Sequence, residues 1–278
     1  ISGGAAEVLG GTVTFNGAAA NTYTGNTVIN AGTLVLDNSN LSSGQLASSA
    51  LSMSGGTLKL IGNATTASTQ TFASTVMTSG ANIIQAAPAS GSSLPTLALG
   101  ALGTNVAAGT TVEFIGLATN TTASTAGGTN DTAEAALNSS SPGAIAPTAT
   151  ITTTTAGEQV FDGGTGAVGL LTNAQGIGYA TVGLYDWATT DIVAGTAGTS
   201  PYSIIGGSQV ANFYTIFDGA APDANGTNFD VTGNANFGGN TGGSNSNVQA
   251  ATFRFNTNAA ITLGVNTAGT TGNPVNCS

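Results

Sequence analysis

The chain of 278 residues contains no histidine, one cysteine and only two basic residues, Lys59 and Arg254. Without histidine there is no imidazole base, no Ser–His or Cys–His nucleophile pair and no histidine metal ligand. Two basic side chains cannot neutralise a nucleic-acid backbone, and a phosphate-binding P-loop needs a lysine after its glycines. The single Cys277 has no partner for an intramolecular disulfide or a zinc or iron–sulfur site. We therefore expect no nucleic-acid partner, and most classes of enzyme are excluded.

Charged residues of both signs are scarce and make up 5% of the chain, against about 25% in an average soluble domain. Twelve acidic residues against two basic ones give a net charge of −10. Hydrophobic residues reach 40%, which allows a large core and argues against a disordered chain. No apolar run approaches the roughly 18 residues of a membrane helix, so we expect no membrane insertion. The chain starts at Ile1 without a signal sequence, so we expect a processed mature chain or a piece of a longer one.

Helix-forming Glu, Lys, Arg and Gln are rare, whereas short strand-like runs occur along the whole chain. In these runs apolar residues alternate with Thr or Asn, and Gly or Asn stands at the ends. Examples are residues 12–15, 27–30, 33–36, 213–217, 253–255 and 261–263. The sequence therefore predicts an all-β protein.

A Gly-Thr-apolar-x-apolar pattern occurs three times near the start of the chain, beginning at Gly11, Gly32 and Gly56. The spacings of 21 and 24 residues match the length of one coil of a β-solenoid. In such a fold successive coils stack in register about 4.8 Å apart, and each buries its inward side chains on its neighbours. Outward ladders of Thr and Asn would satisfy hydrogen bonds without charge. We therefore expect a parallel β-helix, or β-solenoid.

The composition divides the chain into three regions. We predict β-solenoid repeats over residues 1–90, and Ser/Thr/Ala/Pro-rich strands with a long loop excursion over 91–157, mainly at 117–150. Residues 158–278 form a second β-rich region, which either continues the solenoid or forms a small sandwich-like domain. A Gly-x-Gly-x-x-Gly run at 164–169 lacks the following helix that a dinucleotide site requires, so no nucleotide cofactor is expected.

Residues 21–34, with the sequence N-T-Y-T-G-N-T-V-I-N-A-G-T-L, resemble the autotransporter passenger-associated β-strand repeat. The pattern of that family is roughly N-x-Y-T-G-x-T-x-[IV]-x-x-G-T-L, and residues 51–60 resemble its end. The resemblance covers about the first quarter of the chain. It implies a secreted or surface-exposed bacterial protein with a right-handed parallel β-helix. Proteins of this kind act as stalks, adhesins or fibres, and the repeat itself carries no catalytic residues.

Acidic and amide side chains gather around a glycine turn in the third region, at Asp218, Asp223, Asn225, Asn228 and Asp230. Oxygen ligands of this kind suit Ca²⁺, although the spacing is not that of an EF-hand and the final bidentate Glu is missing. The alternative is a turn between two strands in which Asp and Asn bond to their own backbone. Calcium is therefore the one cofactor that the sequence suggests.

Aromatic residues are concentrated in the same region, and Tyr185, Trp187, Tyr202 and Tyr214 could form platforms for a sugar, with Asp186 beside them. The alternative is that Tyr185, Asp186 and Trp187 pack a pair of strands at the edge of a core. We keep the four aromatic residues as candidate glycan contacts.

The sequence favours a non-enzymatic structural subunit or segment of an extracellular bacterial fibre, stalk or surface layer, with no catalytic residues. The expected partners are copies of the same chain, joined head-to-tail by β-strand stacking or strand exchange, because open solenoid ends invite further strands. The alternative is a surface adhesin or carbohydrate-binding passenger that binds glycans or other cell-surface components through residues 179–217 or 117–150. A third hypothesis is an extracellular polysaccharide hydrolase, which would need two close carboxylates.

Overall fold

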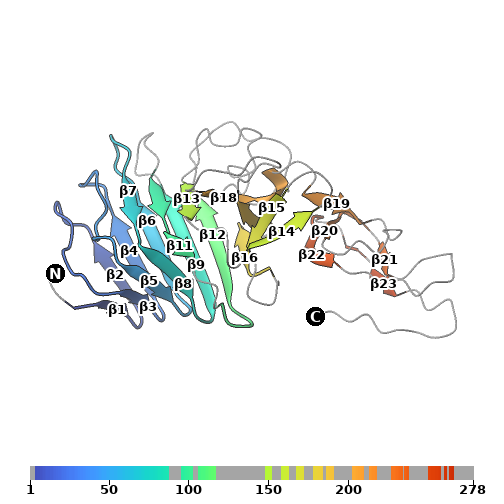
Figure 1. The fold of residues 1–278 in the computed structure, drawn as a ribbon, viewed down its shortest axis with the longest axis horizontal. Helices are drawn as coiled ribbons and strands as arrows, with labels where there is room; N and C mark the ends of the chain where they lie inside the picture. Colours follow the sequence, from blue (N-terminus) through green and yellow to red (C-terminus); the bar gives the residue numbers. More distant parts are fainter. Residues whose placement is uncertain are drawn as a thin grey trace.

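A computed structural model describes residues 4–87, 95–102, 106–116, 148–151, 158–162, 167–171, 178–183, 186–190, 202–209, 213–217, 227–233, 235–237, 250–257, 260–261 and 263–265. These residues form β-strands, joined by turns and one short 3-10 helix, Gly207–Gln209. Strands β1 to β12 stack as a ladder at one end of the molecule, and β19 to β23 lie at the other end (Figure 1). The predicted all-β class and the parallel β-solenoid are confirmed.

The solenoid has two long faces of parallel strands. The first face has the order β1 (Ala6–Val8), β3 (Thr27–Ile29), β5 (Ala50–Met53), β8 (Ser74–Met77) and β11 (Ala101–Leu102). The second face has the order β2 (Thr12–Phe15), β4 (Thr33–Asp37), β6 (Thr57–Ile61), β9 (Ala81–Ala87) and β12 (Thr111–Gly116). Each coil contributes one strand to each face. We call one coil a rung, and the solenoid has about five rungs.

A third, shorter face closes each rung. It begins with single bridges, between Asn21 and Leu46 and between Ser43 and Thr69. It continues with three parallel strands, β7 (Thr69–Thr71), β10 (Thr96–Ala98) and β13 (Thr148–Ile151). The solenoid is therefore three-sided over the rungs that the structure describes.

The register of the second face reproduces the sequence repeat. Thr12 pairs with Thr33, and Thr33 pairs with Thr57, so the three Gly-Thr patterns lie directly on one another. The next partners in this column are Ile83 and Glu113, so the stack continues beyond residue 90 without the Gly-Thr signature. Residues 117–147, which include almost all of the expected excursion, lie outside the described residues.

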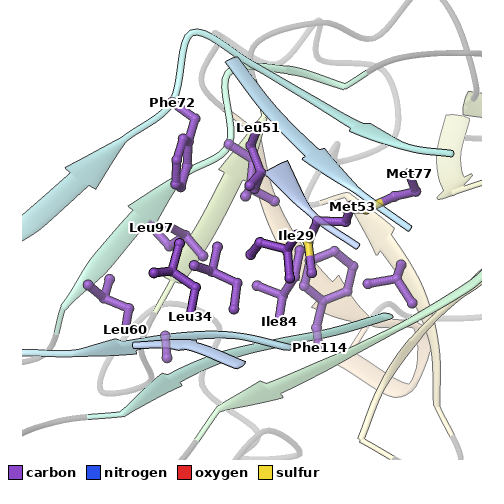
Figure 2. Close-up of a cluster of buried hydrophobic side chains, with 14 of the residues drawn as sticks. Ile29, Leu34, Leu51, Met53, Leu60, Phe72, Met77, Ile84, Leu97 and Phe114 are labelled. Carbon is purple, nitrogen blue, oxygen red and sulfur yellow. The ribbon is translucent and has the colours of Figure 1, made fainter. Parts of the chain in front are cut away.

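The core consists of columns of apolar side chains that point inward from successive rungs. Leu34 and Leu58 form one such column, and Ile29 and Met53 form another, and all four are fully buried. Figure 2 shows Leu34, Ile29 and Met53 among the side chains that meet between the faces. Burial of each such residue contributes roughly 1.5–3 kcal/mol. Alternate residues of the same strands, such as Val35 and Lys59, point outward and are only half-buried.

The residues that carry the passenger-repeat resemblance have structural roles inside one rung. Tyr23 is buried, and its hydroxyl is hydrogen-bonded to Thr27 Oγ1 at 2.7 Å. Thr27 is also bonded to Ser49 of the next rung at 3.2 Å. Gly25 lies so close to the previous rung that a side chain there would collide with the backbone of Gly4. The motif therefore encodes a corner of the coil.

The far end of the solenoid is covered by strands of mixed direction, which we call the cap. Strand β16 (Ala180–Val182) pairs in parallel with β12, and then β17 (Asp186–Thr190) and β18 (Tyr202–Gly206) follow in antiparallel order. Strand β18 returns to pair with β13, and the hairpin of β14 (Glu158–Asp162) and β15 (Ala167–Leu171) joins through β17.

Beyond the cap lies a second group of parallel strands, which we call the C-terminal stack. It contains the sheet of β19 (Tyr214–Ile216), β20 (Thr227–Val231) and β22 (Ala250–Phe255), and the pair of β21 (Ala235–Phe237) and β23 (Leu263–Val265). Phe217, Phe229 and Val231 form a buried cluster of their own, against which Phe253 and Ile261 pack. Region 158–278 thus contains an antiparallel part followed by a short parallel stack.

Candidate functional site

Two of the five predicted calcium ligands, Asn228 and Asp230, lie in the described part of the chain, on β20. Asn228 Oδ1 accepts a hydrogen bond from Thr252 Oγ1 at 2.7 Å. Asp230 is paired with Arg254, so its carboxylate is already neutralised by a cation. Asp218, Asp223 and Asn225 lie outside the described residues. The described residues hold no group of three acidic, Cys or His side chains suited to a metal, and calcium stays a prediction.

Asp230 instead shares the only arginine of the chain, Arg254, with Asp186 of the cap. Arg254 Nε donates to Asp230 Oδ1 at 3.0 Å, and Nη2 donates to Asp230 Oδ2 at 2.8 Å. The third nitrogen, Nη1, donates to Asp186 Oδ1 at 3.1 Å. The guanidinium lies 3.8 Å from the ring centroid of Tyr214, in cation–π contact. One cation therefore joins β22 to β20, β19 and the cap.

Asp186 is the acceptor on the cap side, and its side chain is only 2% exposed. Tyr214 Oη donates to its Oδ1 at 2.8 Å, and the Ser208 amide donates to both oxygens at 3.1 Å. Ser208 Oγ also donates to Oδ2. Residue 206 must be glycine for this arrangement, because a Cβ there would collide with Oδ2 of Asp186. The carboxylate is thus bonded from two sides, by the cap and by the C-terminal stack.

Two of the predicted glycan contacts, Trp187 and Tyr214, lie next to each other in this cluster. The Trp187 amide donates to Tyr214 Oη at 2.9 Å, and the indole Nε1 donates to the Phe253 carbonyl at 3.2 Å. Their polar atoms therefore bond within the protein. Tyr185 lies outside the described residues, and Tyr202 is placed only as the first residue of β18. Glycan contact by these four residues stays a prediction.

The environment keeps Tyr214 neutral and Arg254 charged. Burial raises the pKa of Tyr214, and the negative charge of Asp186 raises it further. Burial of Arg254 acts to lower its pKa, but hydrogen bonds to Asp230 and the charge of Asp186 outweigh this and raise it. One cation and two carboxylates leave the cluster with a net negative charge, which is balanced by donated hydrogen bonds.

Sequence reasoning missed the pairing of Arg254, although a signal for it exists. Asp230 and Arg254 are partners in the register of β20 and β22, and their separation is 24 residues. That is also the spacing between Gly32 and Gly56 in the solenoid. A search for opposite charges separated by one coil length would have found the pair.

The second candidate site is the first rung, formed by β1, β2 and Asn21. Val13 belongs to the same inward column as Leu34, Leu58 and Ile84. It is 37% exposed, whereas Leu34 and Leu58 are 0% exposed, because a rung covers them on both sides. Leu9, at the corner between β1 and β2, is 68% exposed. The second-face column of the core is therefore open to solvent at this end, whereas Val8, which stacks on Ile29 in the first face, is buried.

Glycines at the corners show the same contrast. Gly32 has a φ of +73°, and a Cβ there would collide with Gly11 of the rung below. Gly11 has a φ of +66°, but its Cβ would meet nothing within 4 Å. A polar ladder also ends here, since Ser54 donates to Asn30 at 2.6 Å and Asn30 donates to Glu7 at 2.7 Å. The first rung thus has the shape of an interior rung, with one side uncovered.

Comparison with known proteins gives no match to a family model, to a curated protein or to a solved structure. Within the described residues, no helix has the length and apolar character needed to cross a membrane. What this chain does must therefore be inferred from its own residues, and the uncovered first rung and the Arg254 cluster are the two features that carry the inference.

Proposed function

We propose that the chain is a non-enzymatic structural segment of an extracellular bacterial fibre, stalk or surface layer, and that its copies associate head-to-tail through stacked strands. The observation that carries this proposal is the uncovered first rung. An open edge with unpaired backbone groups and exposed apolar side chains is a template for a further strand. Val13 and Leu9 supply the apolar part of that surface.

The chemistry of the outer surface supports the structural part of the proposal. Neutral side chains such as Asn30 and Ser54 join successive described rungs by hydrogen bonds. Tyr23 and Thr27 of the passenger-like motif hold a corner of the coil together. Membership of the autotransporter-associated repeat proteins, and with it secretion, belongs to this proposal.

The partner surface on a second copy is best supplied by the C-terminal stack. The solenoid's own far end is covered on its second face, because β16 pairs with β12. Among the described residues, four large apolar side chains are exposed. They are Leu9 and Val13 on the first rung, and Ile216 and Phe255 on the C-terminal stack. These two surfaces lie at opposite ends of the molecule (Figure 1), which suits a heterologous, non-closing contact.

Sedimentation velocity over a range of concentrations tests this proposal. Wild-type protein should form a growing series of species, and Val13→Lys should remain monomeric, because it adds a charge at the uncovered end of the core. Ser52→Lys is the matched control, since Ser52 points outward from the interior strand β5. Equal association of both variants, or a wild-type monomer at every concentration, would contradict the proposal.

A surface adhesin is the second candidate, because Trp187 and Tyr214 lie next to each other beside Asp186, although their hydrogen bonds are made within the protein. Loss of glycan-array binding in Trp187→Ala, with self-association unchanged, would favour it. Hydrolysis is less well supported. Asp186 and Asp230 share Arg254, and their oxygens accept several hydrogen bonds, so neither is free to act as an acid or base.

A further inference from the structure

We propose that the C-terminal stack is a separately cored unit that docks on the cap through the Arg254–Asp186 ion pair, and that it undocks before the solenoid unfolds. We call this ion pair the latch. The inference concerns one chain by itself, so it holds whether or not copies associate.

The first support is the separation of the two cores. Phe217, Phe229 and Val231 pack with one another and with Phe253, and this cluster does not include the side chains of the solenoid core. Phe229 and Phe253 are stacked with ring centroids 5.6 Å apart, and Phe217 meets both rings edge-on. Such a cluster can persist when the stack leaves the cap, because the ring contacts described for it lie within the stack.

The second support is the polar character of the joint between cap and stack. Among the residues that the structure describes, hydrogen bonds across it converge on two neighbouring cap residues, Asp186 and Trp187. Asp186 accepts from Arg254 and Tyr214, and Trp187 donates to Tyr214 and Phe253. Water can replace each of these hydrogen bonds after undocking, whereas the apolar columns of the solenoid lose their burial if the rungs separate.

In the described part of the joint, apolar side chains also pack against glycines of the cap. The Phe213 ring packs where Gly207 leaves room, since a Cβ there would collide with the ring. Within the cap, the Trp187 ring lies 3.0 Å from where a Cβ of Gly178 would stand, and Thr252 of β22 approaches the same position from the stack at 3.5 Å. These contacts orient the stack on the cap, and the latch pairs the positive charge of Arg254 with the negative charge of Asp186. Removal of Arg254 would leave two buried carboxylates without their cation, a strongly unfavourable state.

The position of Trp187 makes the proposal directly measurable. It is the only tryptophan in the chain, and its indole bonds to Phe253 across the joint. Trp187 emission and acrylamide quenching therefore report docking, while far-UV circular dichroism is dominated by the strands of the whole chain. Heating the wild-type protein should shift the emission to the red and raise quenching at a lower temperature than the loss of the dichroism signal.

Arg254→Gln and Lys59→Gln form a matched pair, because each removes one of the two positive charges. Lys59 points outward from β6, away from the joint. At room temperature Arg254→Gln should show red-shifted emission and increased quenching, with the β-sheet dichroism retained, and Lys59→Gln should match wild type. Arg254→Lys keeps the charge but cannot make the two parallel hydrogen bonds to the carboxylate of Asp230. Its emission transition should therefore fall between those of wild type and Arg254→Gln.

Coincident emission and dichroism transitions in the wild-type protein would overturn the proposal. So would an Arg254→Gln protein that folds with wild-type emission and quenching. If Arg254→Gln fails to fold, the wild-type two-probe comparison and Arg254→Lys still decide the matter.

Discussion

The solenoid and the joint behind it hold strands together by different chemistry. In the solenoid, every rung repeats the same inward apolar positions, as in the column of Leu34 and Leu58, and adds neutral hydrogen bonds outside. In the joint, one guanidinium is shared between Asp186 and Asp230. Repetition spreads stability over many equivalent contacts, whereas the joint concentrates it in one cation. A substitution should therefore have a local effect in the solenoid, whereas one that removes the cation or a carboxylate at the joint should weaken docking of the whole C-terminal stack.

The largest expected effect is at Asp186. Asp186→Ala should destabilise docking of the C-terminal stack by about 3–5 kcal/mol, because it leaves Arg254 without one partner in a buried site. Thermal melts followed by Trp187 emission measure this change. The double variant with Arg254→Gln should lose less than the sum of the single losses, since the two residues act on one ion pair. Strict additivity of the two losses would contradict a shared latch.

A core substitution in the solenoid should come next. Leu58→Ala should cost about 2–5 kcal/mol, because it opens a cavity in a fully buried column. Val13→Ala, at the uncovered end of the same column, should cost about 1 kcal/mol or less in the monomer. Urea titrations followed by circular dichroism compare the two. Equal losses would show that the first rung is covered in solution.

The corner glycines sharpen the same contrast on a smaller scale. Gly32→Ala and Gly11→Ala both place a Cβ at positive φ, which costs about 1–2 kcal/mol. Gly32→Ala should cost more, because its Cβ also collides with Gly11, whereas the Cβ of Gly11→Ala meets open space. The difference between the two urea midpoints isolates the contact between rungs. It should disappear if the rungs are not stacked in this register.

Raising the pH into the alkaline range should lower the free energy of unfolding gradually. Burial raises the pKa of Tyr179 above its ordinary value of 10.0. The unfolded chain therefore loses this proton first, so stability is full below about pH 10 and falls as the pH rises above it. The slope is about 1.4 kcal/mol per pH unit for this residue. Tyr179→Phe should reduce the alkaline slope of the urea midpoint, and an unchanged slope would exclude this cause.

The sequence was informative where the same residues recur at coil spacing. The Gly-Thr pattern at Gly11, Gly32 and Gly56 specified the period, and the register of the second face follows it. Beyond β9 the corner residues differ and the spacing from Ile83 to Glu113 grows, so the later rungs carry no repeat signal. The antiparallel cap was also hidden, because short strands of alternating residues do not reveal their direction.

The sequence indicated which residues belong to the candidate sites, but not which of these residues contact one another. Asp186, Trp187, Tyr214 and Asp230 were all singled out, since acidic and aromatic side chains are rare in this chain. Their arrangement depends on contacts between strands far apart in sequence, such as Arg254 with Asp186 across 68 residues. Local pattern carries no information about such distant pairs.

Negative-stain electron microscopy of the purified chain, over rising concentration, tests the central claim most directly. We predict filaments or linear oligomers that lengthen with concentration, as expected for an uncovered first rung that docks on the opposite end of another copy. Dispersed single particles at every concentration would contradict the account.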